Sequence, residues 1–239
     1  MRYPVQSRPR HTRTFAPAAI VAIIMLQGPA PIAAQPAFTP ASYVSGQLPV
    51  APVLAVSGGE VFLEVHVTAD GGVDSTRTLR ATPPFTDVVI NAIRGWRFTP
   101  ATGAAPPSAA PAAAPIRSAA AAVLVAAVFA PPALNGPTLG VPPHDVLSAS
   151  DDIPYPTHVV PADYPPRAVG DGAVLLDVTV DGNGALTDTK IKSSSPAFEA
   201  AAWVAARLWS FRPAQRNGRP VSAHTYILFV FRQPVLGMR

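Results

Sequence analysis

Two stretches of the chain alternate apolar and polar positions with the period of a β-strand that buries one face. They span residues 61–67 and 174–180. The apolar positions are Val61, Leu63, Val65 and Val67 in the first stretch and Val174, Leu176, Val178 and Val180 in the second. Both are followed by glycine-containing turns, at residues 69–72 and 182–184, which supply the positive-φ positions that a tight hairpin needs. The pattern predicts a β-hairpin in each half of the chain.

A helix is predicted after each hairpin. Thr82-Pro83 and Ser195-Pro196 each present a capping hydroxyl followed by proline at the first helical position. Apolar residues then recur at helical spacing, namely Phe85, Val89, Ala92, Ile93 and Trp96 in the first helix and Phe198, Ala202, Ala205, Ala206 and Trp209 in the second. Each helix therefore packs one apolar stripe on its hairpin, and the aromatic residues expected in the cores are Trp96, Phe98, Trp209 and Phe211.

A third strand is predicted at residues 226–231 and, in the first half, at residues 123–129, both apolar on both faces. Residues 226–231 carry no charge, although natural edge strands usually protect themselves with lysine, proline or a bulge. Such a strand needs cover. In one interpretation both faces are buried, one under the helix and the other against the first half or a second chain, so a homodimer is one option. In the other, the edge of the strand accepts an extended segment of a partner.

The two halves are related by an internal repeat. Residues 51–101 align with residues 164–214 at a constant offset of 113 without a gap, and 18 of the 51 positions are identical. The matches fall on strand alternation, turn glycines and aromatic residues. The repeat predicts an α+β protein with two tandem β-β-α-β domains, each a small antiparallel sheet packed by one helix. We expect these domains at residues 51–130 and 164–239, with an N-terminal linker at 35–50 and a proline-rich linker at 131–163.

The first 34 residues have the anatomy of a secretory signal peptide, with four arginines, an apolar run at residues 15–26 and small residues ending at Ala34. We expect cleavage after Ala34 and a periplasmic protein. The alternative is an uncleaved segment that anchors the protein in the inner membrane, which is the only membrane contact we expect. The apolar run of 12 residues is shorter than the roughly 20 that a membrane-spanning helix needs, which favours cleavage.

Composition excludes several classes of function. The chain has no cysteine, which rules out disulfides, thiolate metal sites and cysteine nucleophiles. Its net charge of +4 comes from the arginines of the first 34 residues, so the remainder is formally neutral and predicts no nucleic-acid partner.

No motif of an enzyme occurs in the chain. The histidines are dispersed without metal-ligand spacing, and there is no Gly-x-Ser-x-Gly and no phosphate-binding loop. The run from Asp181 to Gly184 resembles the start of a calcium loop, but the twelfth position is Lys192 in place of a bidentate acid, which favours a hairpin turn. We therefore expect no catalytic residue, no metal site and no cofactor.

The second copy resembles the C-terminal domain family of TonB over residues 164–232. The residues that carry the resemblance are Tyr164-Pro165, Gly172-Ala173-Val174, the run 178–184, Ser193-Ser194-Ser195-Pro196, Phe198-Glu199, the run Trp209 to Ala214, and Asn217-Gly218-Arg219-Pro220-Val221. The first copy is a weaker match. It keeps residues 59–67, Gly71, Trp96-Arg97-Phe98 and Pro100, but it lacks the Tyr-Pro pair and the Asn-Gly-Arg-Pro turn.

The resemblance implies a periplasmic domain that binds outer-membrane transporters or other envelope proteins by adding an extended partner segment to its last strand. The residues of this chain that correspond to such a site are Tyr164, Pro165, Tyr226, Leu228 and Val230. Family members often carry Gln-Pro-x-Tyr-Pro, and here Pro161 and Ala162 stand at the first two positions. Energy-transducing members also need a retained membrane helix and a long periplasmic rod, which this chain does not show. Two functions follow, an adaptor in TonB-dependent outer-membrane transport, or a structural or envelope-binding module that reuses the fold.

Overall fold

The computed structural model describes residues 39–55, 57–102, 118–119, 121–131 and 141–234. Residues 35–239 form one compact unit. The predicted leader lies outside the described residues. The fold is mixed α+β, mostly sheet with two helices, α1 (Phe85–Arg94) and α2 (Glu199–Ala206). We call residues 39–131 the first half and residues 141–234 the second half.

The predicted hairpins and closing strands are confirmed. In the first half they are β2 (Gly59–Val67), β3 (Val73–Ala81) and β7 (Ala121–Phe129). In the second half they are β10 (Gly172–Val180), β11 (Leu186–Ser194) and β15 (Ala223–Phe231). A short 3-10 turn, η1 (Pro196–Phe198), precedes α2. The order of these elements is the same in both halves.

The two halves share one sheet, whereas the sequence predicted two separate small sheets. The strand order is β11-β10-β15-β7-β2-β3-β8, where β8 (His144–Asp145) is a short strand. All neighbours in this sheet are antiparallel except β15 and β7, which run parallel from Tyr226 beside Val125 to Val230 beside Phe129. We call this parallel pair the seam. The repeat could not reveal it, because each half contains the same local pattern whether or not the halves pair.

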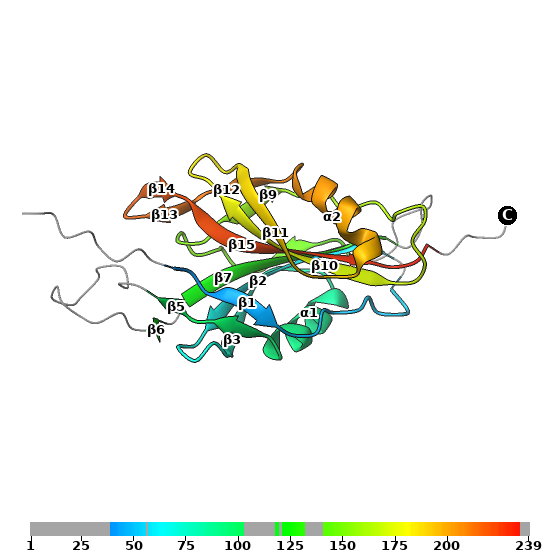
Figure 1. Ribbon diagram of the computed structural model, residues 1–239, viewed down its shortest axis with the longest axis horizontal. Helices are drawn as coiled ribbons and strands as arrows, with labels where there is room; N and C mark the ends of the chain where they lie inside the picture. Colours follow the sequence, from blue (N-terminus) through cyan, green and yellow to red (C-terminus); the bar gives the residue numbers. More distant parts are fainter. Residues whose placement is uncertain (1–38, 56, 103–117, 120, 132–140, 235–239) are drawn as a thin grey trace, which may run out of the picture. The chain divides into compact units, whose positions relative to one another are not determined.

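The helices cover opposite faces of the sheet (Figure 1). One core, the α1 cluster, joins α1 to one set of alternating strand residues, and the other, the α2 cluster, joins α2 to the alternate set. This inversion follows from the parallel seam. Two parallel strands related by a twofold rotation along their own direction present opposite faces, so equivalent helices end up on opposite sides. Residues of β15 enter both clusters alternately, which is why its sequence is apolar on both faces.

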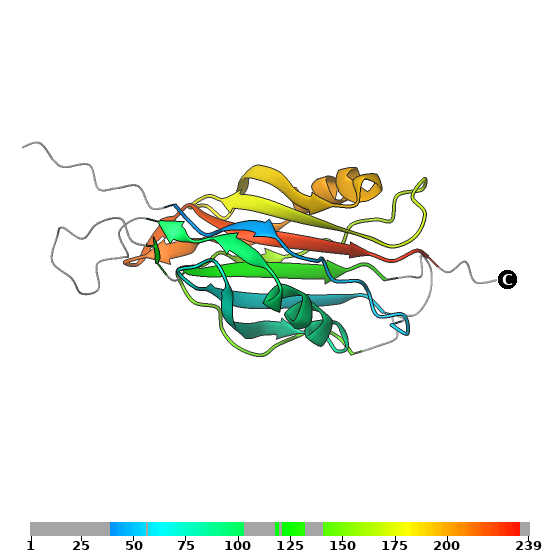
Figure 2. The ribbon, with the colours of Figure 1, turned by 60° about the horizontal axis from the view of Figure 1, so that its bottom comes forward.

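Short strands occupy both segments that the sequence assigned to linkers. In the first, β1 (Ser42–Ser45) pairs with β4 (Arg97–Thr99), and in the second, β9 (Tyr155–His158) pairs with β12 (Ser210–Arg212). Figure 2 brings forward the face of the sheet on which α1 and β1 lie. The remaining small pairs are β5 (Ala101–Thr102) with β6 (Ser118–Ala119) and β13 (Ala214–Arg216) with β14 (Arg219–Val221). The last pair is the predicted Asn217-Gly218 hairpin, with φ of 53° and 72° at its two turn residues.

Equivalent contacts hold the two tryptophans. The indole Nε1 of Trp96 donates to the Gln47 carbonyl at 2.9 Å, and that of Trp209 donates to the Val160 carbonyl at 2.9 Å. Both donor and acceptor therefore differ by the offset of 113. The exposed fractions of Trp96 and Trp209 are 0% and 4%. Phe98 and Phe211 are also buried, so all four aromatic residues expected in the cores lie there.

The hydroxyls of Thr82 and Ser195 are not helix caps, contrary to the prediction. Thr82 Oγ1 accepts from the Glu60 backbone N–H at 3.1 Å, and Ser195 Oγ accepts from the Ala173 N–H at 3.3 Å. Both acceptors thus tie the start of β2 or β10 to the approach to its helix. The nearby strand offers a backbone donor that local sequence reasoning does not see, and no side-chain cap is made at α1 or η1.

The turn glycines are required by space as well as by backbone conformation. Gly71 and Gly184 have φ of +83° and +84°. A Cβ at either position would lie 1.9 Å from a backbone carbonyl oxygen, of Phe98 or of Phe211. The same carbonyl-bearing residues donate their N–H to Gly71 and Gly184 at 2.8 and 3.1 Å. Each hairpin turn is therefore locked against the short strand that follows its helix.

Trp209→Ala should lower the free energy of unfolding by about 3–5 kcal/mol, because it leaves a large cavity in the α2 cluster and removes the bond to Val160. Trp203→Ala is the matched control, since Trp203 is 41% exposed and stacks with Arg207. Urea unfolding followed by circular dichroism measures both. A Trp209→Ala variant as stable as Trp203→Ala would contradict the core assignment.

Candidate partner-binding surface

The three residues of β15 that the resemblance implied for partner binding are in the core. The exposed fractions of Tyr226, Leu228 and Val230 are 1%, 0% and 2%. Their side chains belong to the α1 cluster, together with Val125 and Ala127 of β7. The structure therefore gives them a packing position in the interior of the sheet, and no partner can reach them in this arrangement.

Both edges of β15 are also occupied. One edge pairs with β10 along the whole strand, from Gly172 beside Phe231 to Val180 beside Ala223. The other pairs with β7 through the seam. Strand addition needs unpaired N–H and C=O groups along one edge. The expected open edge of the second half is thus closed by the equivalent strand of the first half.

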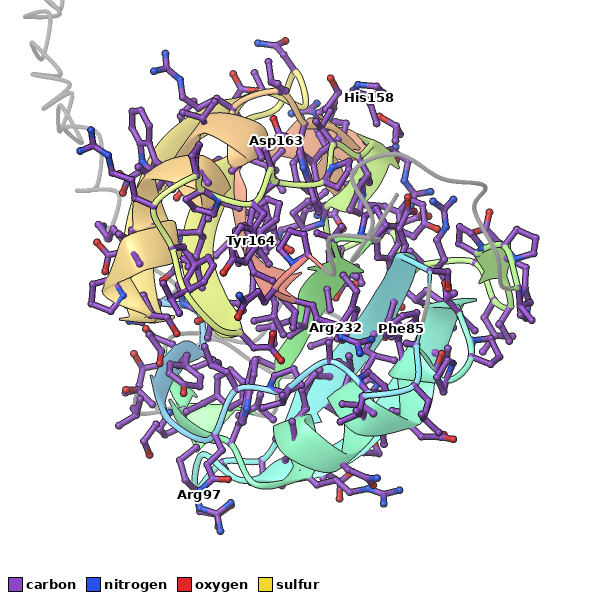
Figure 3. All side chains as sticks on the ribbon, turned by 90° about the vertical axis from the view of Figure 1, so that its right-hand side faces the viewer. Phe85, Arg97, His158, Asp163, Tyr164 and Arg232 are labelled. Atoms are coloured by element: carbon purple, nitrogen blue, oxygen red, sulfur yellow. The ribbon has the colours of Figure 1, made fainter. Side chains whose placement is uncertain are left out.

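Side-chain contacts fasten the seam at its two ends. Near the start of β15, the buried Thr225 hydroxyl donates to the Leu124 carbonyl at 3.1 Å. Past the end, the Arg232 guanidinium donates to the carbonyls of Pro52, Val53 and Ala55, the first at 3.2 Å. Figure 3 looks onto this end of the sheet, where Arg232 lies against the first half. Three carbonyls around one guanidinium make a charge-assisted contact between the halves.

The Tyr226 hydroxyl links β15 to the chain before β1. It accepts from the Tyr43 N–H at 2.8 Å and donates to the Ala41 carbonyl at 3.4 Å. Burial, together with the nearby negative charge of Asp177, raises the pKa of Tyr226 to about 12. The neutral hydroxyl is the form that the folded protein needs, because a phenolate could not donate to Ala41.

Tyr164 and Pro165 lie in the loop before β10. Tyr164 is half-buried, donates its hydroxyl to the Gly170 carbonyl at 2.7 Å, and meets the Phe198 ring edge-on with centroids 5.5 Å apart. The Pro165 carbonyl accepts from Ala168 at 3.0 Å. The pair therefore shapes its own loop against the start of the α2 region. The structure does not bring Tyr164 and Pro165 to a surface shared with Tyr226, Leu228 and Val230.

A buried charge cluster was not predicted from the sequence. Glu64 of β2 is 3% exposed, accepts from the Arg77 guanidinium, and accepts from the Ser150 hydroxyl at 2.9 Å. Burial alone would raise the pKa of the Glu64 carboxyl, but the bonds from Arg77 and Ser150 outweigh it and hold that pKa below its usual value. The cluster fixes the connector at Ser150 on the face opposite α1. In the sequence, Glu64 is a single acidic residue on the polar side of a strand, and a single residue forms no pattern from which this cluster could be predicted.

The turn from Asp181 to Gly184 is confirmed as a hairpin turn. The Asp181 carboxylate accepts from the N–H groups of Asn183 and Ala185, both at 2.9 Å. These bonds, that from Ala185 first, lower the pKa of Asp181. Among the described residues, no group of three His, Asp or Glu side chains could hold a metal ion.

Two sheet edges remain. At one end of the sheet β8 and the residues after it cover only Leu79, Arg80 and Ala81 of β3. At the other end β11 has a single strand neighbour, β10, in the described part of the chain. Both outer strands are largely polar, and β11 carries an ion pair between Lys190 and Asp188 at 2.9 Å. Such charges discourage unspecific pairing of exposed edges.

Comparison with known proteins identifies the second half. Residues 161–232 match the family model described as Gram-negative bacterial TonB protein C-terminal. No curated protein matches the chain. The matched segment contains β10, β11, α2 and β15, and its mixed sheet and helix composition agrees with that fold.

Over residues 161–232 the chain is therefore similar to the TonB C-terminal domain. Domains of this family are periplasmic, act in protein interactions and not in catalysis, and in general bind outer-membrane transporters. The similarity covers residues 161–232. Among the described residues, neither helix has the length and hydropathy of a membrane span.

Tyr226→Phe tests the role of the buried hydroxyl. At neutral pH we expect a loss of about 1–3 kcal/mol, because the Tyr43 N–H and the Ala41 carbonyl lose their partner. The folded-state pKa of Tyr226 is raised above the ordinary value of about 10, so its stabilising effect is complete below about pH 10 and is lost as the pH rises towards 12. Urea titrations at pH 8, 10 and 11 should show a shallower decline for Tyr226→Phe than for the parent. Equal declines would contradict this assignment.

Proposed function

We propose that this is a non-enzymatic, periplasmic protein–protein interaction protein built from two tandem TonB C-terminal-like units. The family match supports this for the second half. For the first half, support comes from contacts that recur at the offset of 113, namely the tryptophan bonds to Gln47 and Val160 and the closed turns at Gly71 and Gly184. The first half is thus a divergent copy that has kept the structural contacts of the family fold.

The observation that carries the functional proposal is the seam. The last strand of each unit, β7 or β15, pairs with the edge of the other unit that would otherwise receive a partner. The function that this geometry favours is an envelope-binding module that reuses the TonB C-terminal fold without energy transduction. Pulling on β15 through a paired partner would require separating it from β7, against hydrogen bonds along the seam and the Arg232 contact.

The second candidate is an adaptor in TonB-dependent outer-membrane transport, and the family match over residues 161–232 favours it. In this function, β15 leaves β7 and pairs with an extended segment of the transporter. The measured affinity would then be reduced by the fraction of molecules whose seam is open. A mutation that weakens the seam must increase that fraction.

Periplasmic placement rests on the leader, which lies outside the described residues. A mature chain that begins near Gln35 is the expected form, and N-terminal sequencing of the exported protein checks it. Recovery of the intact Met1 form in the inner membrane would instead support the anchored alternative.

Arg232→Ala separates the two candidate functions. This substitution removes the contact between the end of β15 and residues 52–55, and so loosens the seam. All other residues of the segment that matches the family stay the same. Fluorescence anisotropy measures binding of a labelled peptide from the periplasmic segment of an outer-membrane transporter. If the protein is an envelope-binding module without energy transduction, we expect the parent and Arg232→Ala to bind the transporter peptide with equal affinity.

The adaptor predicts that Arg232→Ala binds the transporter peptide several-fold more tightly, because opening costs less. Arg207→Ala, which removes a surface cation stacked on Trp203, is the matched control and should change nothing. Tighter binding by Arg232→Ala but not by Arg207→Ala would overturn the module in favour of the adaptor.

A further inference from the structure

The chain itself performs strand addition at one place. The short strand β8 adds to the outer edge of β3, with His144 beside Ala81 and Asp145 beside Arg80. The pairing continues past β8, where the N–H of Val146 donates to the Leu79 carbonyl at 2.7 Å. The end of β3 is therefore an edge that accepts an extended segment.

The second half contains the same edge. By the offset of 113, Leu79, Arg80 and Ala81 correspond to Lys192, Ser193 and Ser194 at the end of β11. The irregularity that shapes this edge is also repeated. The register with the neighbouring strand shifts between Phe62 and Leu63 in the first half and between Leu175 and Leu176, the corresponding residues, in the second.

The backbone geometry places one N–H and one C=O group on the outer side of this edge. Ser195 donates its N–H to the Ala173 carbonyl at 2.9 Å. Because antiparallel ladders alternate, the N–H and C=O of the preceding residue, Ser194, point away from β10. In the described part of the chain no strand is hydrogen-bonded to that edge of β11, although β1 lies close to β11. Ser194 thus corresponds to Ala81 without its partner.

The surroundings leave room for a segment. A hollow of about 310 Å³ adjoins this edge and is lined by Leu48, Pro49 and Val50 of the first half together with residues 171–173, 193–195, Val230 and Phe231. One of the lining apolar side chains, Val50, is 63% exposed. The edge-protecting ion pair of β11 lies further along the strand, at Asp188 and Lys190. The one lysine near the edge, Lys192, donates to the Ser42 hydroxyl at 2.9 Å and is held by the first half.

We propose that residues 192–194 of β11 form a strand-addition site for an extended, uncharged segment of a partner protein. The inference rests on the proposed interaction function and gives it a place other than β15. The chemistry of the partner follows from the comparison with β8. Arg80 binds Asp145 at 2.8 Å, whereas its counterpart Ser193 is uncharged and hydrogen-bonds to the Tyr43 side chain, so the partner needs no acidic residue at this position. Main-chain bonds give the affinity, and the apolar side chains that line the hollow favour apolar residues of the partner.

The probe is a labelled peptide with the sequence of residues 142–149 of this chain and alanine in place of Asp145, which removes the group that Arg80 recognises. NMR titration of the full-length mature protein should show new hydrogen-exchange protection of the Ser194 amide on binding. Protection at residues 79–81 or along β15, or no binding, would overturn the proposal. Protection of Ser194 without peptide would show that the edge is already covered, and a concentration-dependent dimer that protects it would assign it to a second copy. Either result would also overturn the proposal.

Ser194→Pro is the decisive variant. It removes the outward N–H but no bond to β10, so an edge strand tolerates it. Ser194→Ala is the matched control, because both variants lose the bond from Ser194 Oγ to the Glu199 carboxylate while alanine keeps the N–H. We expect Ser194→Pro to weaken peptide binding tenfold or more and Ser194→Ala to bind like the parent. Equal binding by the two variants would overturn the proposal. If Ser194→Pro does not fold, the hydrogen-exchange protection of the Ser194 amide in the parent protein decides.

Failure of this site is distinguishable from failure of the interaction function. If the peptide does not bind but transporter peptides do, the edge assignment fails and the interaction function stands. If the intact protein binds neither, both fail.

Discussion

The parallel pairing of β7 with β15 is the constraint on which the rest of the structure depends. A strand with apolar side chains on both faces needs cover on both, and its backbone groups need partners on both edges. β10 supplies one edge and α2 one face. β7 supplies the other edge, and the α1 cluster covers the other face. Neither half can satisfy its last strand alone, so each completes the other.

The short strands β1 and β9 follow from the same arrangement. Tyr43 of β1 reaches Tyr226 of the opposite half, and Tyr155 of β9 meets Phe62 of the opposite half with ring centroids 5.7 Å apart. Each of these short strands thus contacts the half to which it does not belong. The seam is consequently held by contacts well outside it, which makes opening the edge of β15 a large rearrangement. Strand addition that leaves the seam closed must use another edge. The end of β11 is such an edge, because the equivalent end of β3 in the first half already pairs with β8.

The predicted helical pattern extended to Trp96 and Trp209, whereas α1 ends at Arg94 and α2 at Ala206. Local periodicity was otherwise sufficient to predict the hairpins, the two helices and the closing strands, because each needs only its own apolar pattern. It also placed Trp96 and Trp209 in the cores. The pairing of β7 with β15 could not be predicted, since two strands that are both largely apolar carry no mark of their partner. The bonds of Thr82 and Ser195 to β2 and β10, and of Ser150 to Glu64, join residues far apart in sequence. The same holds for the site, where the resemblance pointed to Tyr226, Leu228 and Val230 but only the fold shows that these are enclosed.

The seam can be tested directly in solution by nuclear Overhauser effects between the backbone protons of β7 and β15 in dilute, monomeric protein. The account predicts cross-strand contacts in parallel register, with Ala127 beside Leu228 and Val125 beside Tyr226. Absence of these contacts in a folded protein, with amides of β15 exchanging freely on the side away from β10, would contradict it. The edge implied by the family resemblance would then be open.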